Sequence, residues 1–182
     1  MTREAIIVID LQNEYLPTGK LPLTGIESAA ANAANVIASA RERAIPVFHI
    51  QHIFANKEMP VFVPDSDGIK IQPSVLPAGN EPIIVKNYVN AFLKTNLRQL
   101  LEEQGITSLV VVGAMSHMCV DAAVRAASDF GYDVTVLHDA CATLDLEFNG
   151  VRVPAEQVHA TMMAALAFAY ARVISTGEYL QR

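Results

Sequence analysis

Residues 109–120 read LVVVGAMSHMCV, an apolar run followed by a short polar turn and a cysteine. The run Leu109–Gly113 is apolar throughout, which is typical of a strand buried on both faces of a parallel sheet. The segment Cys119–Phe130 has apolar residues at three- and four-residue spacing and predicts a helix. Because backbone N–H groups at a helix start favour a thiolate, Cys119 is a candidate nucleophile. The alternative is an inert buried thiol.

The same alternation of apolar runs and helical patterns extends along the chain. Apolar runs predict strands at Ala5–Asp10, Pro46–Ile50, Ile83–Lys86, Leu109–Gly113, Val134–Asp139 and Arg172–Ser175. Helical spacing predicts helices at Ile26–Arg43, Thr95–Glu103, Cys119–Phe130 and Pro154–Ala169. Residues suited to helix ends are Thr95 as a cap, Gly105 and Gly131 as terminators, and Pro154 in a first turn. Strands that alternate with helices predict a three-layer α/β/α fold around a six-stranded parallel sheet.

Two connections lack a sustained period. Phe54–Glu81 is rich in proline and predicts a long loop, of the kind that forms binding loops, lids or oligomer contacts. Thr143–Pro154 predicts a second irregular connection. Since the sequence has no internal repeat and no break in composition, we expect residues 1–182 to form a single domain.

Composition narrows the class of partner. The chain has 182 residues, 52% of them hydrophobic and 18% charged, and a formal charge of −6. Without a basic stripe, nucleic-acid binding is disfavoured and a small-molecule substrate is favoured. Two cysteines form no disulfide framework, and Met1–Arg3 leads directly into a strand without a signal peptide, so we expect a cytoplasmic protein. No apolar stretch reaches the roughly 18 to 20 residues that cross a bilayer, so no membrane association is expected.

Three reactive side chains follow or end predicted strands. Asp10 ends the first strand, Lys86 ends the third, and Cys119 follows the fourth. The carboxyl ends of parallel strands meet at one edge of the sheet, where ligands bind. A thiol needs a base to become a thiolate, and an ammonium nearby favours both the thiolate and the carboxylate. The pattern therefore predicts one catalytic site.

The motifs around these residues resemble the isochorismatase-like cysteine hydrolases, a group that includes nicotinamidases and N-carbamoylsarcosine amidohydrolases. The resemblance runs in order through Ile7–Asn13, Val85–Phe92, Val112–Val120 and Asp139–Cys141 and covers nearly the whole chain. It implies a catalytic triad of Asp10, Lys86 and Cys119. It also implies a sheet order of 3-2-1-4-5-6 and a homo-oligomer, either a dimer or a tetramer.

The mechanism that the resemblance implies is acyl transfer. Asp10 accepts the thiol proton, Lys86 stabilises the thiolate, and Cys119 forms an acyl-thioester that water then releases. The backbone N–H groups of Met115 and Cys119 form the oxyanion hole, and the Ala114–Met115 peptide bond is cis. In the implied order the strand of Lys86 lies two positions, about 10 Å, from that of Asp10. The lysine must therefore lean across, or the chain after Val85 must fold inward.

The sequence departs from nicotinamidases near the end of the second strand. Those relatives place an aspartate and two histidines there to hold a metal ion, whereas this chain reads Gln51-His52-Ile53-Phe54. Since a single histidine does not make a metal site, we expect no metal and no other cofactor. Gln51 or His52 could reach the pocket from the end of the second strand, but a structural role is the favoured interpretation for both, as it is for His49. Candidate pocket residues are Gln12, Gln51, Tyr88, Phe92 and His117.

Three functions stay open. Members of the group specialised for cleaving the enol ether of isochorismate commonly lack the cysteine, and that reaction needs an acid instead of a nucleophile. This chain has Cys119, which favours hydrolysis of an amide, ureide or similar C–N bond. The alternatives are an enol-ether hydrolase that uses Asp10 as its acid and a non-catalytic binding protein on the same fold.

Overall fold

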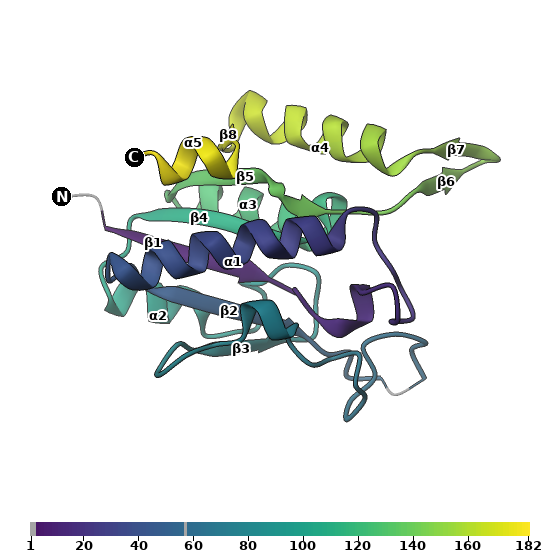
Figure 1. Cartoon of the computed structure of the whole chain (residues 1–182), viewed down its shortest axis with the longest axis horizontal. Coiled ribbons are helices and arrows are strands. Elements are labelled where there is room, and N and C mark those ends of the chain that lie inside the picture. The colour runs from purple at the N-terminus through teal and green to yellow at the C-terminus, as the bar shows by residue number, and fades with distance from the viewer. Residues whose placement is uncertain (1–2, 57) are drawn as a thin grey trace.

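Six parallel strands form the central sheet, in the order β3-β2-β1-β4-β5-β8 (Figure 1). A computed structural model describes residues 3–56 and 58–182. Met1 and Thr2 of the expected domain and Lys57 of the expected long loop lie outside the described residues. The strands are β1 (Glu4–Ile9), β2 (Val47–His52), β3 (Ile83–Lys86), β4 (Ser108–Ala114), β5 (Asp133–Ala142) and β8 (Arg172–Ile174). The predicted parallel sheet and its order are confirmed, with β8 as its sixth strand.

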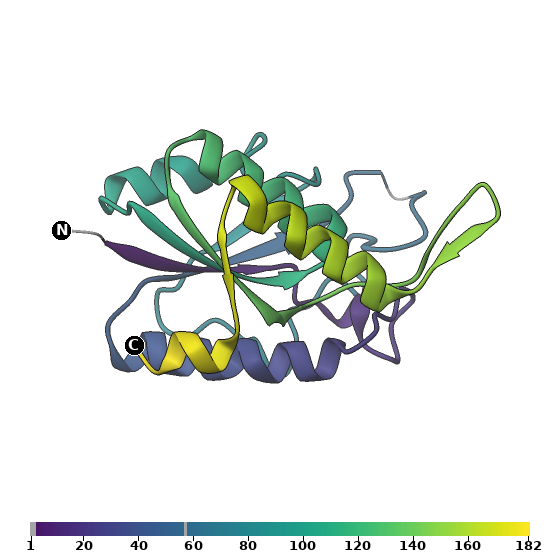
Figure 2. The same ribbon diagram turned by 90° about the horizontal axis from the view of Figure 1, so that it is seen from above.

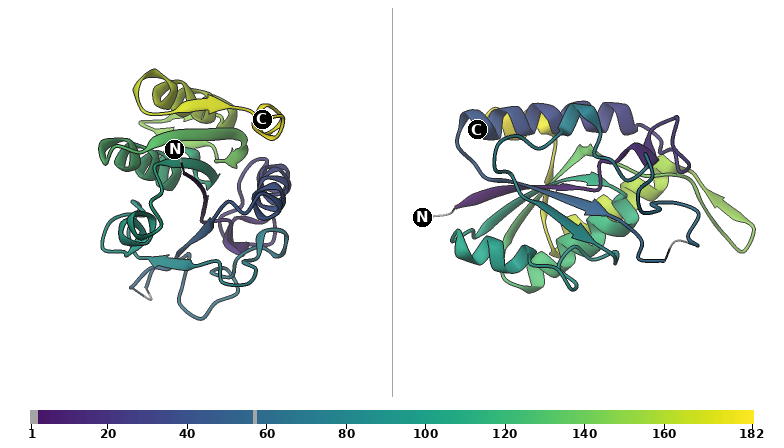
Figure 3. Two further views of the ribbon diagram at one scale, coloured as in Figure 1. Left: turned by 90° about the vertical axis from the view of Figure 1, so that its left-hand side faces the viewer. Right: turned by 90° about the horizontal axis from the view of Figure 1, so that it is seen from below.

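Helices cover both faces of the sheet (Figures 2 and 3). One face carries α1 (Ile26–Glu42) and α5 (Thr176–Leu180), and the other carries α2 (Leu97–Glu103), α3 (Asp121–Asp129) and α4 (Ala155–Ala169). The predicted three-layer arrangement is therefore confirmed. Of the helices in the described ranges, none is long and apolar enough to cross a membrane.

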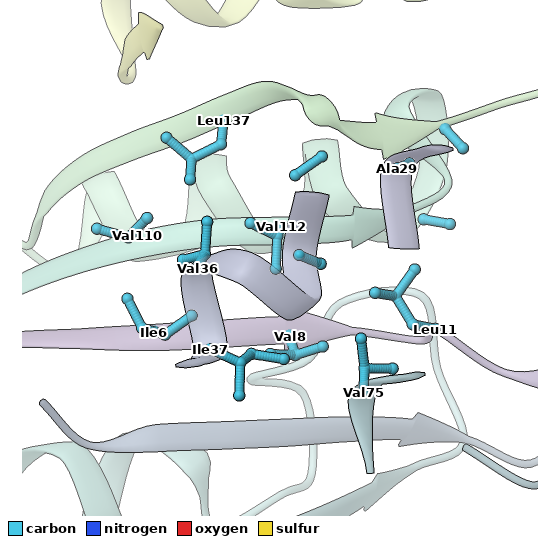
Figure 4. Close-up of a cluster of buried hydrophobic side chains, with 14 of the residues drawn as sticks. Ile6, Val8, Leu11, Ala29, Val36, Ile37, Val75, Val110, Val112 and Leu137 are labelled. Carbon is cyan, nitrogen blue, oxygen red and sulfur yellow. The ribbon is translucent and has the colours of Figure 1, made fainter. Parts of the chain in front are cut away.

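The two faces of each central strand enter two separate apolar clusters. Ile6 and Val8 of β1 pack against the α1 side, together with Val36 and Ile37 of the helix (Figure 4). Alternate residues of β1 face the other helices. Because both faces are buried, the central strands read as continuous apolar runs instead of alternating ones.

Several predicted boundaries shift by a few residues. The helix predicted at Thr95 begins at Leu97, with Asn96 as its N-cap. The Thr95 hydroxyl donates to the Ala91 carbonyl at 2.6 Å and accepts the N–H of Leu97 at 3.4 Å. Pro154 is the N-cap of α4 and not its first helical residue. The helix predicted from Cys119 is divided into a π-helical turn, η3 (Ser116–Val120), and α3. Cys119 therefore lies in a widened turn ahead of the regular helix.

The second irregular connection was predicted incorrectly, because it contains a β-hairpin. Strands β6 (Leu146–Phe148) and β7 (Val151–Val153) pair antiparallel and project beyond the end of the sheet (Figure 1). Asn149 and Gly150 both have positive φ, 51° and 76°. Asn-Gly with both residues left-handed is the favoured two-residue hairpin turn, so the sequence held a signal for this element.

The long loop 54–81 is largely irregular, as predicted, with one 3-10 turn, η2 (Pro73–Val75). Its backbone is bonded to the segment that follows β1. The Gly68 carbonyl accepts the N–H of Glu14 at 2.9 Å, and the Leu11 carbonyl accepts the N–H of Gln72 at 2.9 Å. The buried Glu14 carboxylate also accepts the N–H of Phe62 at 2.8 Å. The loop is thus fixed beside the carboxyl end of β1.

Gly113 controls how closely β4 approaches β1 before the turn that leads to Cys119. Its φ is +127°, and a Cβ at this position would lie 2.0 Å from the Ile9 carbonyl oxygen. The pairing of β4 with β5 shifts register between Val111 and Gly113. A side chain at Gly113 would combine a strained backbone with a clash against the neighbouring strand.

We expect Gly113→Ala to lower the free energy of unfolding by about 3 kcal/mol or more, measured by urea denaturation. Gly131→Ala is the matched control, since Gly131 also has a positive φ of 90° but open space around its Cβ position. That control should cost about 1 kcal/mol, from the backbone conformation alone. Equal losses in the two variants would contradict the role of the β1–β4 approach.

Candidate active site

Asp10 lies at the carboxyl end of β1, in the middle of the sheet. Its N–H donates to the Ile50 carbonyl at 3.1 Å, and its own carbonyl accepts the N–H of Gln12 at 2.8 Å. Its φ of 50° is left-handed, a conformation that aspartate and asparagine adopt more readily than most residues. The backbone thus turns sharply at Asp10, and the carboxylate is fully buried.

Lys86 reaches across β2 to the carboxylate. It is the last residue of β3 and is 1% exposed. Its Nζ lies 2.8 Å from Oδ2 of Asp10, 3.2 Å from Sγ of Cys119 and 3.0 Å from Nδ1 of His52. The side chain leans across the neighbouring strand, one of the two ways that we expected the separation in the sheet to be closed. The structure thus brings Asp10, Lys86 and Cys119 together.

Cys119 is carried by the η3 turn and is 6% exposed. The Met115 carbonyl accepts the N–H groups of Met118 and Val120, at 3.0 and 3.2 Å, which closes the turn. The peptide bond between Ala114 and Met115 is cis, as the resemblance implied. A π-helical turn of this kind is often found at functional sites.

Sequence reasoning missed the contacts that hold this turn to the rest of the fold. The buried Ser116 hydroxyl lies 3.2 Å from the Ala142 carbonyl of β5 and 2.8 Å from Nδ1 of His159 on α4. Through Ser116 the turn is therefore bonded to a strand and to a helix. The polar Ser116 next to Met115 was the only signal in the sequence.

Lys86 and Asp10 each stabilise the charged form of the other. Burial alone would lower the pKa of Lys86, but Asp10 and Cys119 raise it above its usual value, so Lys86 is an ammonium. Burial raises the pKa of Asp10, and the ammonium at 2.8 Å opposes this shift. The ammonium therefore stabilises the ionised form of the Asp10 carboxyl against the effect of burial.

The Cys119 thiol differs from our expectation of a lowered pKa. Burial raises the pKa of Cys119, the Asp10 carboxylate raises it further, and Lys86 only partly compensates. The physical reason is that the free-energy cost of removing a thiolate from water exceeds the stabilisation that a helix N-terminus gives it, which is about 0.3 to 1 kcal/mol. The resting site therefore holds a thiol, a carboxylate and an ammonium. A thiolate forms when the thiol proton passes to Asp10.

His52 is the residue of this site that sequence reasoning assigned a structural role. It is 4% exposed, and burial together with the Lys86 ammonium lowers its pKa to about 3, so its ring is neutral. The Phe54 and Phe62 rings meet it edge-on, with centroids 4.4 and 5.2 Å away. The predicted strand order could have indicated this contact, since β2, which ends at His52, lies between the strands of Asp10 and Lys86.

Two of the expected pocket residues, Gln12 and Gln51, make hydrogen bonds to the long loop. The Gln12 and Gln51 side-chain amides both donate to the Ile69 carbonyl at 2.8 Å. Gln12 also donates to the His52 carbonyl at 2.9 Å and accepts the His52 N–H at 2.8 Å. Because both amide N–H bonds of the buried Gln12 are in use, it holds the loop and β2 in place.

The other expected pocket residues make contacts of their own. Tyr88 is exposed and its hydroxyl accepts from Lys94 at 3.2 Å. Phe92 packs against Phe130, with ring centroids 5.3 Å apart. His117 Nδ1 lies 2.6 Å from the Thr143 hydroxyl. In the described part of the chain, none of them is hydrogen-bonded to Asp10, Lys86 or Cys119.

A cavity of about 270 Å³ lies beside the end of β5, and Cys141, Thr143 and His159 are among its lining residues. Cys141 is buried, and burial raises its pKa to about 12. The second cysteine is thus a protonated thiol.

Within residues 3–56 and 58–182, no group of three or more histidine, cysteine, aspartate or glutamate side chains could hold a metal ion. His52 belongs to the segment that was compared above with the metal-binding segment of nicotinamidases. Its Nδ1 atom accepts a hydrogen bond from Lys86.

Known proteins match the chain over nearly its full length. The isochorismatase domain family matches residues 4–178. YddQ, an isochorismatase family protein of Bacillus subtilis, is 46% identical over 177 residues, covering 97% of this chain and 98% of YddQ. A crystal structure of an isochorismatase hydrolase from Oleispira antarctica has a TM-score of 0.96 at 48% identity, covering 100% of this chain and 97% of that one. N-carbamoylsarcosine amidase from Arthrobacter sp. is 29% identical over 135 residues, 65% of this chain and 51% of the amidase.

We expect iodoacetamide to alkylate Cys119 with a pH midpoint above that of an ordinary thiol, about 8.5, because burial and Asp10 raise its pKa. The Cys141→Ala variant removes the second thiol, and mass spectrometry follows the adduct. The midpoint depends on ionisation of the thiol alone, because limited access of iodoacetamide to the buried sulfur lowers the alkylation rate by the same factor at every pH. A midpoint below pH 7 would show a resting thiolate and contradict this prediction.

Proposed function

The chain belongs to the isochorismatase family, and from this premise we propose that it is a cysteine hydrolase that cleaves a C–N bond of a small amide-like substrate. The observation that carries the proposal is the contact of a thiol, a carboxylate and an ammonium in a buried site, with Lys86 Nζ 2.8 Å from Asp10 and 3.2 Å from Cys119. This set contains a nucleophile, a base and a counter-charge.

Acylation begins with proton transfer from Cys119 to Asp10. As Sγ attacks the substrate carbonyl, the C–S bond forms and the carbonyl electron pair moves onto oxygen. The backbone N–H groups of Met115 and Cys119 are the proposed donors to this oxyanion. Asp10 then gives its proton to the leaving amine, the C–N bond breaks, and an acyl-thioester remains on Cys119.

Deacylation runs through the same groups. Asp10 accepts a proton from a water molecule that attacks the thioester, the C–S bond breaks, and the Asp10 proton returns to sulfur. Throughout, the Lys86 ammonium stabilises the negative charge, which moves between the carboxylate and the sulfur. Burial strengthens this interaction, because a low dielectric weakens electrostatic interactions less than water does.

One named relative and the pairing of Asp10 with Lys86 support amide chemistry over enol-ether cleavage. The similar protein from Arthrobacter sp. is by name an amidase. Enol-ether cleavage needs a protonated acid, whereas Asp10 forms an ion pair with Lys86 at 2.8 Å. A carboxylate that is paired with an ammonium is better suited to accept the thiol proton.

We expect Cys119→Ala and Asp10→Asn each to lower kcat by about 10³-fold or more on a small amide or ureide, because each removes one half of the proton transfer. Asparagine is chosen because it also adopts the left-handed backbone of position 10. Ammonia release measures turnover in a screen of amides and ureides, and chromatography follows the loss of isochorismate, which contains no nitrogen. Mass spectrometry detects the acyl adduct on Cys119.

The other outcomes of this experiment separate the alternatives. Turnover of isochorismate that survives Cys119→Ala but is lost in Asp10→Asn would favour an enol-ether hydrolase. A wild-type protein that forms no acyl adduct and turns over none of the three substrate classes would favour a binding protein. Full amide turnover by Cys119→Ala would refute the nucleophile.

We expect kcat/KM to fall with decreasing pH as Asp10 becomes protonated and can no longer accept the thiol proton. Because burial raises the pKa of Asp10, this acid limb should lie above about 3.9, the value of an ordinary aspartate. The raised pKa of Lys86 keeps the ammonium through neutral pH, so activity should persist well above pH 8. An acid limb at or below pH 3.9, read from kcat/KM profiles, would contradict this assignment.

A further inference from the structure

We propose that His52 is a positioning residue that orients the Lys86 ammonium so that one of its N–H bonds points at Cys119. This inference rests on the proposed function, because it assigns His52 a part in forming the thiolate. It concerns a side chain that the proposed mechanism does not use. His52 acts through Lys86 and has no assigned contact with substrate.

The sheet places the two side chains directly beside each other. His52 and Lys86 are register partners at the ends of β2 and β3, so their side chains project from the same face of the sheet. The N–H of Ile53 also donates to the Lys86 carbonyl at 3.0 Å. Since β2 separates β3 from β1, Lys86 must pass the end of β2, where His52 lies, to reach Asp10.

The ammonium of Lys86 makes two hydrogen bonds beside its ion pair. A lysine ammonium has three N–H bonds and no acceptor. It donates to His52 Nδ1 at 3.0 Å and to Cys119 Sγ at 3.2 Å, whereas Asp10 Oδ2, 2.8 Å away, is its ion-pair partner without the geometry of a hydrogen bond. The hydrogen bond to His52 and the attraction of Asp10 together restrict the rotation of the ammonium. A second N–H bond is then directed at sulfur.

His52 is suited to this role in both charge and orientation. A neutral ring with a free lone pair on Nδ1 accepts from the ammonium without competing with Asp10 as a second carboxylate would. The ring is also held in place. Gln12 bonds both backbone groups of His52, at 2.8 and 2.9 Å, and the rings of Phe54 and Phe62 pack edge-on against it.

Two variants separate the acceptor from mere packing, both in a Cys141→Ala background. His52→Asn places an amide oxygen near the position of Nδ1, whereas His52→Leu fills the site without an acceptor. His49→Leu is the control, because His49 lies on the same strand and is equally buried but contacts Glu81, at 3.0 Å. Circular dichroism and thermal unfolding confirm that each variant is folded.

The readouts are the pH profile of Cys119 alkylation by iodoacetamide and the kinetics on the amide found in the substrate screen. The profile is followed from pH 7 to the highest pH at which circular dichroism shows every variant folded, and its displacement along the pH axis gives the change in midpoint. We expect His52→Leu to raise the alkylation midpoint by about one pH unit, a tenfold loss of thiolate. It should also lower kcat by about tenfold or more while KM stays within twofold. His52→Asn should stay within about threefold of the parent in both, and His49→Leu should leave both unchanged.

Two results would overturn the inference. One is a His52→Leu variant with the alkylation midpoint and kcat of the parent. The other is a His52→Asn variant that is as impaired as His52→Leu, which would reduce His52 to packing. Alkylation does not depend on turnover, so the two proposals fail separately. A shifted midpoint without any amide turnover would count against the proposed function alone.

Discussion

The ion pair between Lys86 and Asp10 is the interaction on which the site depends. Both groups are almost completely buried, and removing an ion from water costs several kcal/mol even after relaxation. Such a pair persists only where the surrounding structure supplies further partners in fixed positions. His52 and Cys119 are those partners for the ammonium. The left-handed turn at Asp10, the close approach at Gly113 and the η3 turn are the backbone features that bring these groups together.

The sheet and the meeting of Asp10, Lys86 and Cys119 could be predicted from the sequence, because both depend on strong, simple signals. Continuous apolar runs mark strands buried on both faces, and reactive residues after such runs share one edge of the sheet. The role proposed for His52 could not be found in this way, because a lone histidine at a strand end has many structural explanations. Only its register with Lys86 distinguishes it, and register is a property of the folded sheet. The hairpin at Asn149-Gly150 was predictable from its turn residues, and we missed it.

The thiol shows how magnitudes decide between opposing effects. The position of Cys119 before a helix predicts a lowered pKa, and a neighbouring ammonium acts in the same direction. Burial and the Asp10 carboxylate act in the opposite direction and are stronger. The sequence shows that Cys119 precedes a helix but not how deeply the turn is buried. A cysteine that rests as a thiol is also protected from oxidation, since the thiolate is the reactive form.

The long loop is coupled to the ion pair through His52. Its second half is hydrogen-bonded to the residues after β1, through the Gly68 carbonyl and the Gln72 N–H, while Phe62 is held by Glu14. Phe54 and Phe62 of this loop pack edge-on against the His52 ring, which contacts Lys86. A substitution at either phenylalanine therefore reaches the buried charges without touching them. As related proteins diverge, the sequence of this loop and the environment of the ion pair would change together.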